Sequence, residues 1–324
     1  MKKLKYSLIT VVAIILLLIA GIIYFFVWND APMLYGKVIR QITYKEGHRL
    51  DIYLPTEQKH NKNAVIVFFH GGAWVSGVKE AVNFNRVNEA INVLRDNGYA
   101  IVSPNYSLAS RDKSPFPDCI NDAFDALAWV KENAELYNFD LDNVGLIGES
   151  AGAHIALMAA YAKPLDFSNS IRNLPKINYV VDIYGPTDLE KIYHMQSIEK
   201  INQHIKKLPK NIRKHIDISQ QLYGFDPEKD SIKSLFFQKK YSPIYYLSAN
   251  SPPTLIIHGN EDQIVPVDQS IYLKKKLDSL NIESQIHIID GVNHAFRGIK
   301  HENKAKVQIW ISEFIMKYYR DKNP

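Results

Sequence analysis

Residues 144–158 read VGLIGESAGAHIALM. The first part is an apolar run typical of a buried strand, GESAG at 148–152 is a sharp turn, and the rest is an apolar helix. This is the G-x-S-x-G pattern in a strand–turn–helix context, which pushes the side chain of Ser150 outward. Glycines flank the serine because a Cβ at either place would collide with the turn or a neighbouring strand. We predict that Ser150 is reachable, with free backbone N–H groups at the start of the helix.

Strands and helices alternate on both sides of this turn. Further predicted strands lie at 38–44, 49–54, 64–69, 99–103, 178–183, 254–258 and 284–289. Predicted helices lie at 83–97, 116–137, 268–280 and 303–319. The first two strands are expected to form a hairpin, and the continuous apolar run at 64–69 suits a central parallel strand. The alternation predicts an α/β fold with a doubly wound, mostly parallel sheet, whose chemistry lies beyond the carboxyl ends of the strands.

Residues 188–240 break this alternation, and we expect them to form a small helical cap over that edge of the sheet. Weakly amphipathic pieces lie at 189–205 and 212–222. Several apolar side chains of the cap either line a pocket or pack the cap onto the body. These are Ile192, Tyr193, Met195, Leu222, Tyr223, Phe236 and Phe237.

An uncharged run covers residues 6–28, and three lysines precede it. Its 23 residues exceed the roughly 20 that a bilayer core needs and the roughly 7–15 of a signal-peptide core. We therefore predict a cytoplasmic tail at 1–5, a transmembrane signal anchor at 6–28, a linker at 29–37 and one α/β domain at 38–324. This places the domain outside the cytoplasm at the cell membrane. A cleaved signal peptide and a secreted protein is the alternative.

The composition excludes several classes of protein. The 324 residues, of which 46% are hydrophobic, suffice for one large domain with a sizeable core. The single cysteine, Cys119, excludes an internal disulfide and a cysteine zinc site, and we expect it to be buried in a helix. The net charge of +5 comes mostly from the three N-terminal lysines, so nucleic acid is not an expected partner. Metal and nucleotide motifs are absent from the sequence, and no metal or organic cofactor is expected.

Two later strand ends carry the residues that would activate a serine. The predicted strand at 254–258 is followed by HGNEDQIVP at 258–266, and the strand at 284–289 by DGVNHAF at 290–296. A serine nucleophile needs a base, and the base needs an acid to orient it. The order Ser150, Asp262, His294 predicts a catalytic triad of nucleophile, acid and base.

Other residues near these strand ends compete for the same roles. Glu261, Asp268 and Asp290 are alternative acids, and Asp268 is better explained as an N-cap of the following helix. Asp262 is preferred because it sits in the turn that Val265 closes. Two other histidines are interpreted as structural. His154 lies on the predicted helix that follows Ser150, and His258 lies at the end of the predicted strand at 254–258.

The sequence HGGAW at 70–74 follows the strand at 64–69. Its glycines would let backbone N–H groups approach a substrate and bind the negative charge of a tetrahedral intermediate. The predicted oxyanion hole consists of backbone N–H groups from Gly71, Gly72, Ala73 and Ala151. His70 is interpreted as a residue that organises this loop.

These motifs together resemble the α/β-hydrolases of the esterase/lipase kind. The likeness covers about residues 38–320 and rests on HGGAW, GESAGAH, HGNEDQIVP and GVNHAF. It extends to the hormone-sensitive-lipase-like and feruloyl/acetyl-esterase-like branches and to arylformamidases. Ala73 stands where the lipase-like branch often has a third glycine, which favours the branch with an HGG-aromatic pattern.

The resemblance implies a carboxylic ester hydrolase that forms an acyl-enzyme on Ser150. A small cap limits the acyl pocket, so we expect esters of about two to six acyl carbons to be preferred. Formamide, amide or peptide hydrolysis with the same triad is the nearest alternative. A membrane-tethered, non-catalytic binding module is the alternative from another class.

Overall fold

A computed structural model describes residues 15–18, 21, 34–84, 86–110, 113–193 and 218–320. Its centre is an eight-stranded sheet in the order β1-β2-β4-β3-β5-β6-β7-β8. The strands are β1 (Val38–Lys45), β2 (His48–Tyr53), β3 (Asn63–Phe69), β4 (Tyr99–Pro104), β5 (Phe139–Glu149), β6 (Ile177–Ile183), β7 (Thr254–Gly259) and β8 (Ser284–Ile289). Strands β1, β2 and β4 are antiparallel neighbours, and β4 to β8 run parallel. The predicted doubly wound, mostly parallel sheet and its N-terminal hairpin are therefore confirmed.

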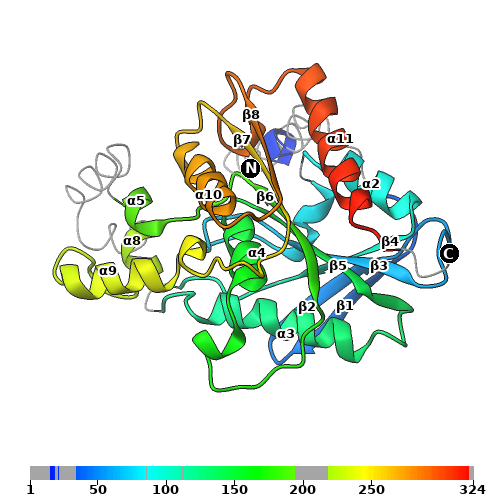
Figure 1. Cartoon of the computed structure of the whole chain (residues 1–324), viewed down its shortest axis with the longest axis horizontal. Coiled ribbons are helices and arrows are strands. Elements are labelled where there is room, and N and C mark those ends of the chain that lie inside the picture. Colours follow the sequence, from blue (N-terminus) through cyan, green and yellow to red (C-terminus); the bar gives the residue numbers. More distant parts are fainter. Residues whose placement is uncertain are drawn as a thin grey trace, which may run out of the picture.

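Helices cover both faces of the sheet (Figure 1). One face carries α3 (Asp118–Glu132), α4 (Ala151–Tyr161) and α10 (Asp268–Ser279), and the other carries α2 (Asn88–Asp96) and α11 (His301–Lys317). Each face buries its own apolar cluster, because the central strands are apolar on both sides. Cys119 is buried on α3, as expected. The crossovers bring the carboxyl ends of β3, β5, β6, β7 and β8 to one edge, and the site lies there.

Two helices are shorter than the periodicity predicted. In place of one helix at 83–97, a short 3-10 turn, η1 (Lys79–Asn83), ends at Asn83, and α2 begins only at Asn88. The amide of Asn83 donates to Glu80 O at 3.0 Å, and the amide of Asn88 donates to Asn83 O at 2.6 Å. Such side chain–backbone bonds compete with helical ones and separate the two elements. Helix α3 likewise ends at Glu132 rather than near 137.

The described part of the cap consists of α5 (Leu189–Tyr193), α8 (Ile218–Tyr223) and α9 (Ser231–Lys240), which lie together at one end of the molecule (Figure 1). The sequence reading missed α9. Residues 194–217, which include Met195 and most of the predicted piece at 189–205, lie outside the described residues.

Aromatic rings join this cap to the body. Tyr223 stacks on Phe237 with ring centroids 4.5 Å apart, and Phe237 contacts Tyr241 at 4.7 Å. Tyr241 stacks on Phe116 at 4.9 Å, and Phe116 lies 5.6 Å from Trp74. Because Trp74 belongs to the HGGAW loop, this series of rings connects the described part of the cap to the predicted oxyanion loop.

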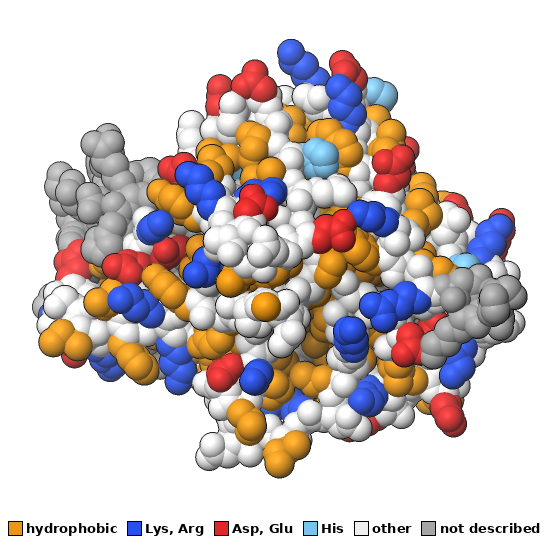
Figure 2. Space-filling model, in the orientation of Figure 1, with side chains coloured by type: hydrophobic (Ala, Val, Ile, Leu, Met, Phe, Trp, Pro, Cys, Tyr) orange, Lys and Arg blue, Asp and Glu red, His pale blue; other side chains and the backbone are white. Residues whose placement is uncertain are grey.

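The expectation that Phe236 lines a pocket or packs the cap is wrong, because its side chain is 67% exposed. It is the neighbouring Phe237 on α9 that packs against the body. Over the face in Figure 2, the charged side chains of both signs are interspersed with apolar ones rather than gathered by sign.

No helix among the described residues is both long and apolar enough to cross a bilayer. Of the predicted span at 6–28, the structure describes only residues 15–18 and 21. The remainder of that prediction, with the tail at 1–5 and most of the linker, lies outside the described residues.

Candidate active site

Ser150 occupies the sharp turn between β5 and α4. Its φ of +52° and ψ of −119° are strained for a residue with a Cβ. Its N–H donates to Ile183 O of the neighbouring strand at 2.9 Å, which holds the turn against the sheet. A Cβ on Gly148 or Gly152 would collide with backbone atoms, so only glycine lets the turn close at those positions. The structure thus has the tight strand-to-helix turn that the G-x-S-x-G pattern predicted.

His294 follows β8 and lies between the other two predicted residues. Its Nε2 is 3.0 Å from Ser150 Oγ, and its Nδ1 is 2.6 Å from Asp262 Oδ2. The side chain of Asn293 accepts from His294 N at 2.6 Å and from Gln263 N at 3.2 Å. This amide therefore ties the loop that carries the histidine to the loop that carries the aspartate.

Asp262 is buried at the carboxyl end of β7 and accepts at both oxygens. Oδ1 accepts from the N–H groups of Ile264 at 2.9 Å and Val265 at 2.8 Å. Oδ2 faces His294 and, at 3.3 Å, Nε2 of His258. Burial by itself would raise the pKa of Asp262, but hydrogen bonds from the two histidines outweigh it and hold the pKa well below its ordinary value. The group is therefore a carboxylate at neutral pH.

The structure does not bring the alternative acids to His294. Glu261 is exposed. Asp290 is exposed and accepts from Asn260 Nδ2 at 2.7 Å. Asp268 is the first residue of α10, and the N-cap is Val267, which makes no side-chain cap, so the interpretation of Asp268 as the N-cap is wrong. The acidic side chain still lies in the first turn of α10, where its negative charge interacts favourably with the helix dipole.

The HGGAW loop packs directly against the serine turn. A Cβ on Gly71 would lie 3.5 Å from Ser150 Cβ and 3.2 Å from Glu149 O, so a larger residue here would be tightly packed against the serine turn. Gly72 has a φ of +124°, and its carbonyl accepts from the N–H groups of Val75 and Ser76, both at 3.0 Å. These bonds close a compact turn beside Ser150.

Four backbone N–H groups at this place were predicted to form the oxyanion hole. They belong to Gly71, Gly72, Ala73 and Ala151. Within the described part of the chain, none of the four donates to a protein acceptor. Ala73 has a φ of +52°, and Ala151 is the first residue of α4, where helical N–H groups have no partner in the helix. The role of these N–H groups in binding an oxyanion stays a prediction.

His70 organises the loop, as expected. Its ring is buried, Nδ1 lies 2.8 Å from Gly71 O, and the ring stacks on Tyr106 at 4.3 Å. The hydroxyl of Tyr106 in turn donates to His70 O at 2.7 Å. Burial lowers the pKa of His70 to about 4, so the imidazole is neutral at physiological pH.

Two buried residues beside the site, Glu149 and Tyr184, were not predicted from the sequence. The contact of His258 with Asp262 was not predicted either. The Tyr184 ring meets His294 edge-on, with centroids 5.0 Å apart, and its hydroxyl donates to Glu149 Oε1 at 3.2 Å. Burial raises the pKa of Glu149 to about 7 although the Tyr184 hydrogen bond and the charge of Arg86 lower it. Glu149 lies inside the GESAG motif, whereas the only signal for Tyr184 was its place after a strand.

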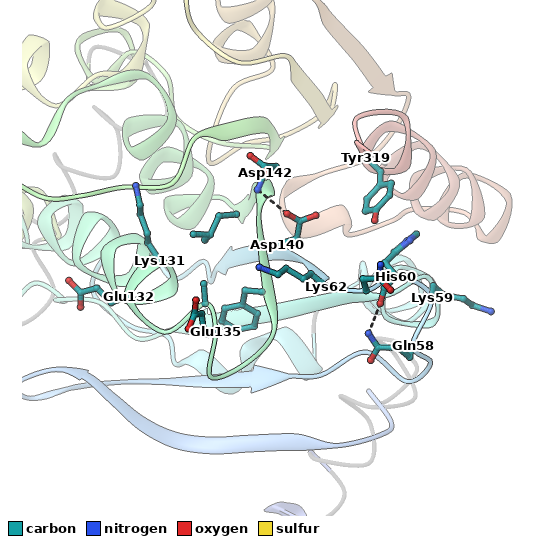
Figure 3. Close-up of a pocket in the computed structure, with 14 residues that line it drawn as sticks. Gln58, Lys59, His60, Lys62, Lys131, Glu132, Glu135, Asp140, Asp142 and Tyr319 are labelled. Carbon is teal, nitrogen blue, oxygen red and sulfur yellow. Dashed lines mark hydrogen bonds between the residues drawn. The ribbon is translucent and has the colours of Figure 1, made fainter. Parts of the chain in front are cut away.

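A cavity of about 860 Å³ lies away from this edge, near the amino ends of β3 and β5 (Figure 3). Polar side chains such as Lys62, Lys131, Glu135 and Asp140 line it, and none of the predicted site residues does. In the described part of the chain, no three His, Cys, Asp or Glu side chains are grouped so as to hold a metal ion.

Comparisons with known proteins agree on the fold. A carboxylic ester hydrolase of Mycobacterium tuberculosis, described as probable and called LipM, is 25% identical over 90% of this chain and 62% of its own length. An ethyl acetate hydrolase of Pseudomonas putida is 24% identical over 79% of this chain and 74% of its own length. A truncated carbohydrate esterase from gut microbiota superposes with a TM-score of 0.67 at 24% identity, over 88% of this chain and 99% of its own.

The sheet order, the serine turn and this structural neighbour define an α/β-hydrolase fold. The family model named BD-FAE matches residues 50–277, and the chain belongs to that family. The chain spans about three-fifths of the length of the mycobacterial relative.

Proposed function

We propose that this protein hydrolyses carboxylic esters, with Ser150 as nucleophile, His294 as general base and Asp262 as the acid that orients the base. One observation carries the proposal. His294 has the serine hydroxyl on one ring nitrogen, at 3.0 Å, and the carboxylate on the other, at 2.6 Å. Because Asp262 accepts from Nδ1, the neutral ring presents an unprotonated Nε2 to Ser150.

In the proposed reaction, Ser150 Oγ attacks the ester carbonyl while His294 Nε2 takes its proton. The imidazolium then gives this proton to the leaving alcohol, which yields an acyl-enzyme. Water, deprotonated by His294, attacks the acyl group and releases the carboxylic acid and free Ser150. Asp262 stabilises the imidazolium in both halves of the cycle.

The negative charge of each tetrahedral intermediate develops beside the HGGAW loop. We propose that N–H groups from Gly71, Gly72 or Ala73, together with Ala151, bind this oxyanion. Their lack of protein acceptors among the described residues supports the role. Such preorganised donors stabilise a transition state more than water does, because they need not reorient during the reaction.

The relatives support the ester as substrate. An ethyl acetate hydrolase and an arylesterase of Saccharolobus solfataricus, 24% and 26% identical, each match this chain over 74% of their own length.

Labelling of the full chain with a serine-directed fluorophosphonate, followed by peptide mapping, tests the proposal. We expect the label on Ser150 and turnover of chromogenic esters. Labelled Ser150 with faster turnover of anilides or aryl formamides would instead identify an amidase or arylformamidase. An unlabelled, inactive protein would identify a binding module.

We further propose a preference for acyl groups of about two to six carbons. The ring contacts that run from Tyr223 to Trp74 join the described part of the cap to the HGGAW loop, which supports a small acyl pocket. A series of esters from acetate to palmitate with one chromogenic alcohol measures this preference. Equal or faster turnover of the sixteen-carbon ester would contradict it and favour a true lipase.

We also propose that residues 6–28 anchor the protein in the cell membrane, with the hydrolase domain outside the cytoplasm. The uncharged run behind three lysines supports this topology. Resistance to alkaline extraction, together with protease accessibility of a C-terminal tag from outside, is the expected result. Recovery from the medium with a new N-terminus near residue 30 would indicate a cleaved signal peptide.

A further inference from the structure

His258 is completely buried at the end of β7, directly behind Asp262. Its Nε2 lies 2.8 Å from Val265 O and 3.3 Å from Asp262 Oδ2, and its Nδ1 lies 2.7 Å from Ser270 Oγ on α10. Both ring nitrogens therefore have partners. Two of these partners belong to the turn that carries the proposed catalytic acid, which the sequence interpretation of a purely structural His258 did not anticipate.

The partners fix the tautomer of His258. A backbone carbonyl only accepts, so Nε2 must carry a hydrogen to bond Val265 O. The Ser270 hydroxyl can donate to Nδ1, which leaves the neutral ring with its one N–H at Nε2. That N–H points at Val265 O and is shared with Asp262 Oδ2, whose longer distance marks the weaker of the two bonds.

With this donor, each oxygen of Asp262 is held from two sides. Oδ1 receives the N–H groups of Ile264 and Val265, and Oδ2 receives Nδ1–H of His294 and Nε2–H of His258. The backbone N–H groups of Ile264 and Val265 hold only Oδ1, so by themselves they allow the carboxylate to rotate about that oxygen. His258 restricts this rotation and also holds the carbonyl that closes the turn.

The charged neighbours of His258 come from the turn after β7 and from β6. Asp262 lies on its Nε2 side, and the buried Asp182 of β6 is the other acidic neighbour. Asp182 Oδ1 accepts from Gly185 N at 2.9 Å, and burial raises the pKa of Asp182 to about 7 although this hydrogen bond lowers it.

The geometry points to His258 as a positioning residue for the proposed reaction. It holds the carboxylate of Asp262, directly and through Val265 O, in the orientation that receives Nδ1–H of His294. This inference rests on the proposed function, because it assigns His258 a role only if Asp262 serves His294. His258 itself touches neither Ser150 nor the reacting atoms.

Four variants of the full chain test this role: His258→Leu, His258→Gln, Ser270→Ala and, as a control, His287→Gln. Leucine removes the donor, whereas glutamine keeps an N–H at a similar reach. Ser270→Ala leaves the ring in place, so it keeps the test valid if the leucine variant fails to fold. His287 lies half-buried on the adjacent β8 and stacks on Trp310 at 4.0 Å instead of facing the triad.

Activity is measured per active site, titrated with fluorophosphonate, as kcat, KM and the pH profile of kcat/KM. We expect His258→Leu to lose about 10- to 100-fold in kcat with little change in KM, because a misplaced acid misaligns the base. Its acid limb should move to lower pH, since the imidazolium of His294 loses its aligned carboxylate. His258→Gln should restore most of kcat, Ser270→Ala should lose less in the same direction, and His287→Gln should match wild type.

Two results would overturn the inference. A His258→Leu variant with a lower melting temperature but unchanged kcat and pH profile would make the residue merely structural. An acid limb that moves to higher pH at full kcat would make His258 only a competitor for the carboxylate. If Ser150→Ala is inactive while His258→Leu behaves as wild type, this inference alone fails. If Ser150→Ala keeps its esterase activity, the proposed function fails with it.

Discussion

Two of the places among the described residues where a serine, a histidine and an aspartate come within hydrogen-bonding distance differ in their geometry. One is the carboxyl edge of the sheet, where His294 has Ser150 on Nε2 and Asp262 on Nδ1. The other lies between the β1–β2 hairpin and α3. The same three residue types meet in both, yet we propose catalysis for only the first.

The second group consists of Ser107, His48 and Asp122. Ser107 Oγ lies 3.2 Å from His48 Nε2, and Asp122 Oδ2 lies 3.3 Å from that same nitrogen. Lys45 Nζ reaches the other oxygen of Asp122 at 2.5 Å. Burial would raise the pKa of Asp122, but hydrogen bonds from His48, Lys45 and Ser107 outweigh it and bring the pKa to about 2.

The difference lies in which ring nitrogens are used. In a catalytic triad the imidazole takes a proton on one nitrogen while an acid on the other nitrogen orients the ring and stabilises the imidazolium. In the hairpin group the serine and the acid share Nε2 of His48, so the acid cannot orient the ring toward the serine. Asp122 is instead the centre of an ion cluster that joins β1 to α3. Proximity of three residue types is therefore not enough to define a triad.

Substitution of the two serines should give the largest contrast. We expect Ser150→Ala to lose about 10³-fold or more in turnover, because the nucleophile is removed. Ser107→Ala should stay within about twofold, since its hydroxyl only serves the hairpin cluster. Chromogenic ester kinetics on both variants give the answer. A tenth of wild-type turnover in Ser150→Ala, or an equal loss in Ser107→Ala, would contradict the distinction.

Substitution of the two acids comes next. Asp262→Asn should lower kcat by about 10²- to 10⁴-fold, because an amide can hold the wrong tautomer of His294. Asp122→Asn should leave kcat near wild type but lower the free energy of unfolding by about 1–3 kcal/mol, because Lys45 and His48 lose their buried partner. Kinetics and urea unfolding at pH 7 separate the two effects. A catalytic loss in Asp122→Asn with unchanged stability would reverse the assignment.

The pH dependence of stability should differ in sign between the two regions. The folded pKa of Asp122, about 2, lies below its ordinary value, so its contribution is present above about pH 4 and is lost as pH falls toward 2. The folded pKa of Glu149, about 7, lies above its ordinary value. The contribution of Glu149 to stability is therefore greatest at low pH and falls as pH rises from about 4.5 to 7.

Glu149→Gln should remove the decline in stability at rising pH, on the order of 1–3 kcal/mol between pH 5 and 8. It should leave the loss of stability at acidic pH unchanged. Asp122→Asn should do the opposite. Denaturant unfolding from pH 3 to 8 measures both curves. Parallel curves for wild type and Glu149→Gln would mean that Glu149 is already ionised in the folded protein.

The sequence allowed one of the two groups to be predicted. Ser150, Asp262 and His294 each follow an apolar strand, and the parallel sheet brings such ends to one edge. No motif marks Ser107, and its approach to the histidine depends on how the hairpin and the following loop fold together.

Contacts that depend on the exact course of a turn could not be predicted from the sequence either. His258 is a strand residue, and only the closed turn at 262–265 brings its Nε2 to the carboxylate. Tyr184, which meets His294, has a φ of +45°, a value that an aromatic residue rarely adopts and that no periodicity indicates. Helix α9 was missed because its large apolar side chains are divided between an exposed face and a packed one, which blurs the amphipathic pattern.

The smallest effects should come from the tyrosines that meet each histidine edge-on. Tyr184 lies 5.0 Å from His294, and Tyr44 lies 6.1 Å from His48. Tyr184→Phe keeps the ring, so we expect turnover to fall by no more than about threefold. It removes the hydroxyl that donates to Glu149, a bond that lowers the pKa of that carboxyl, so the decline in stability should extend to higher pH.

Tyr44→Phe is the matched control, because its hydroxyl donates to Asn105 O at 2.5 Å and its ring also stays in place. It should cost about 1 kcal/mol of stability and leave both kcat and its pH profile unchanged. Ester kinetics and unfolding at several pH values measure both variants. A loss of more than tenfold in kcat for Tyr184→Phe would mean that the Tyr184–Glu149 hydrogen bond, rather than the ring, keeps His294 aligned. The orientation of the base would then depend on the β5 and β6 ends as well as on Asp262.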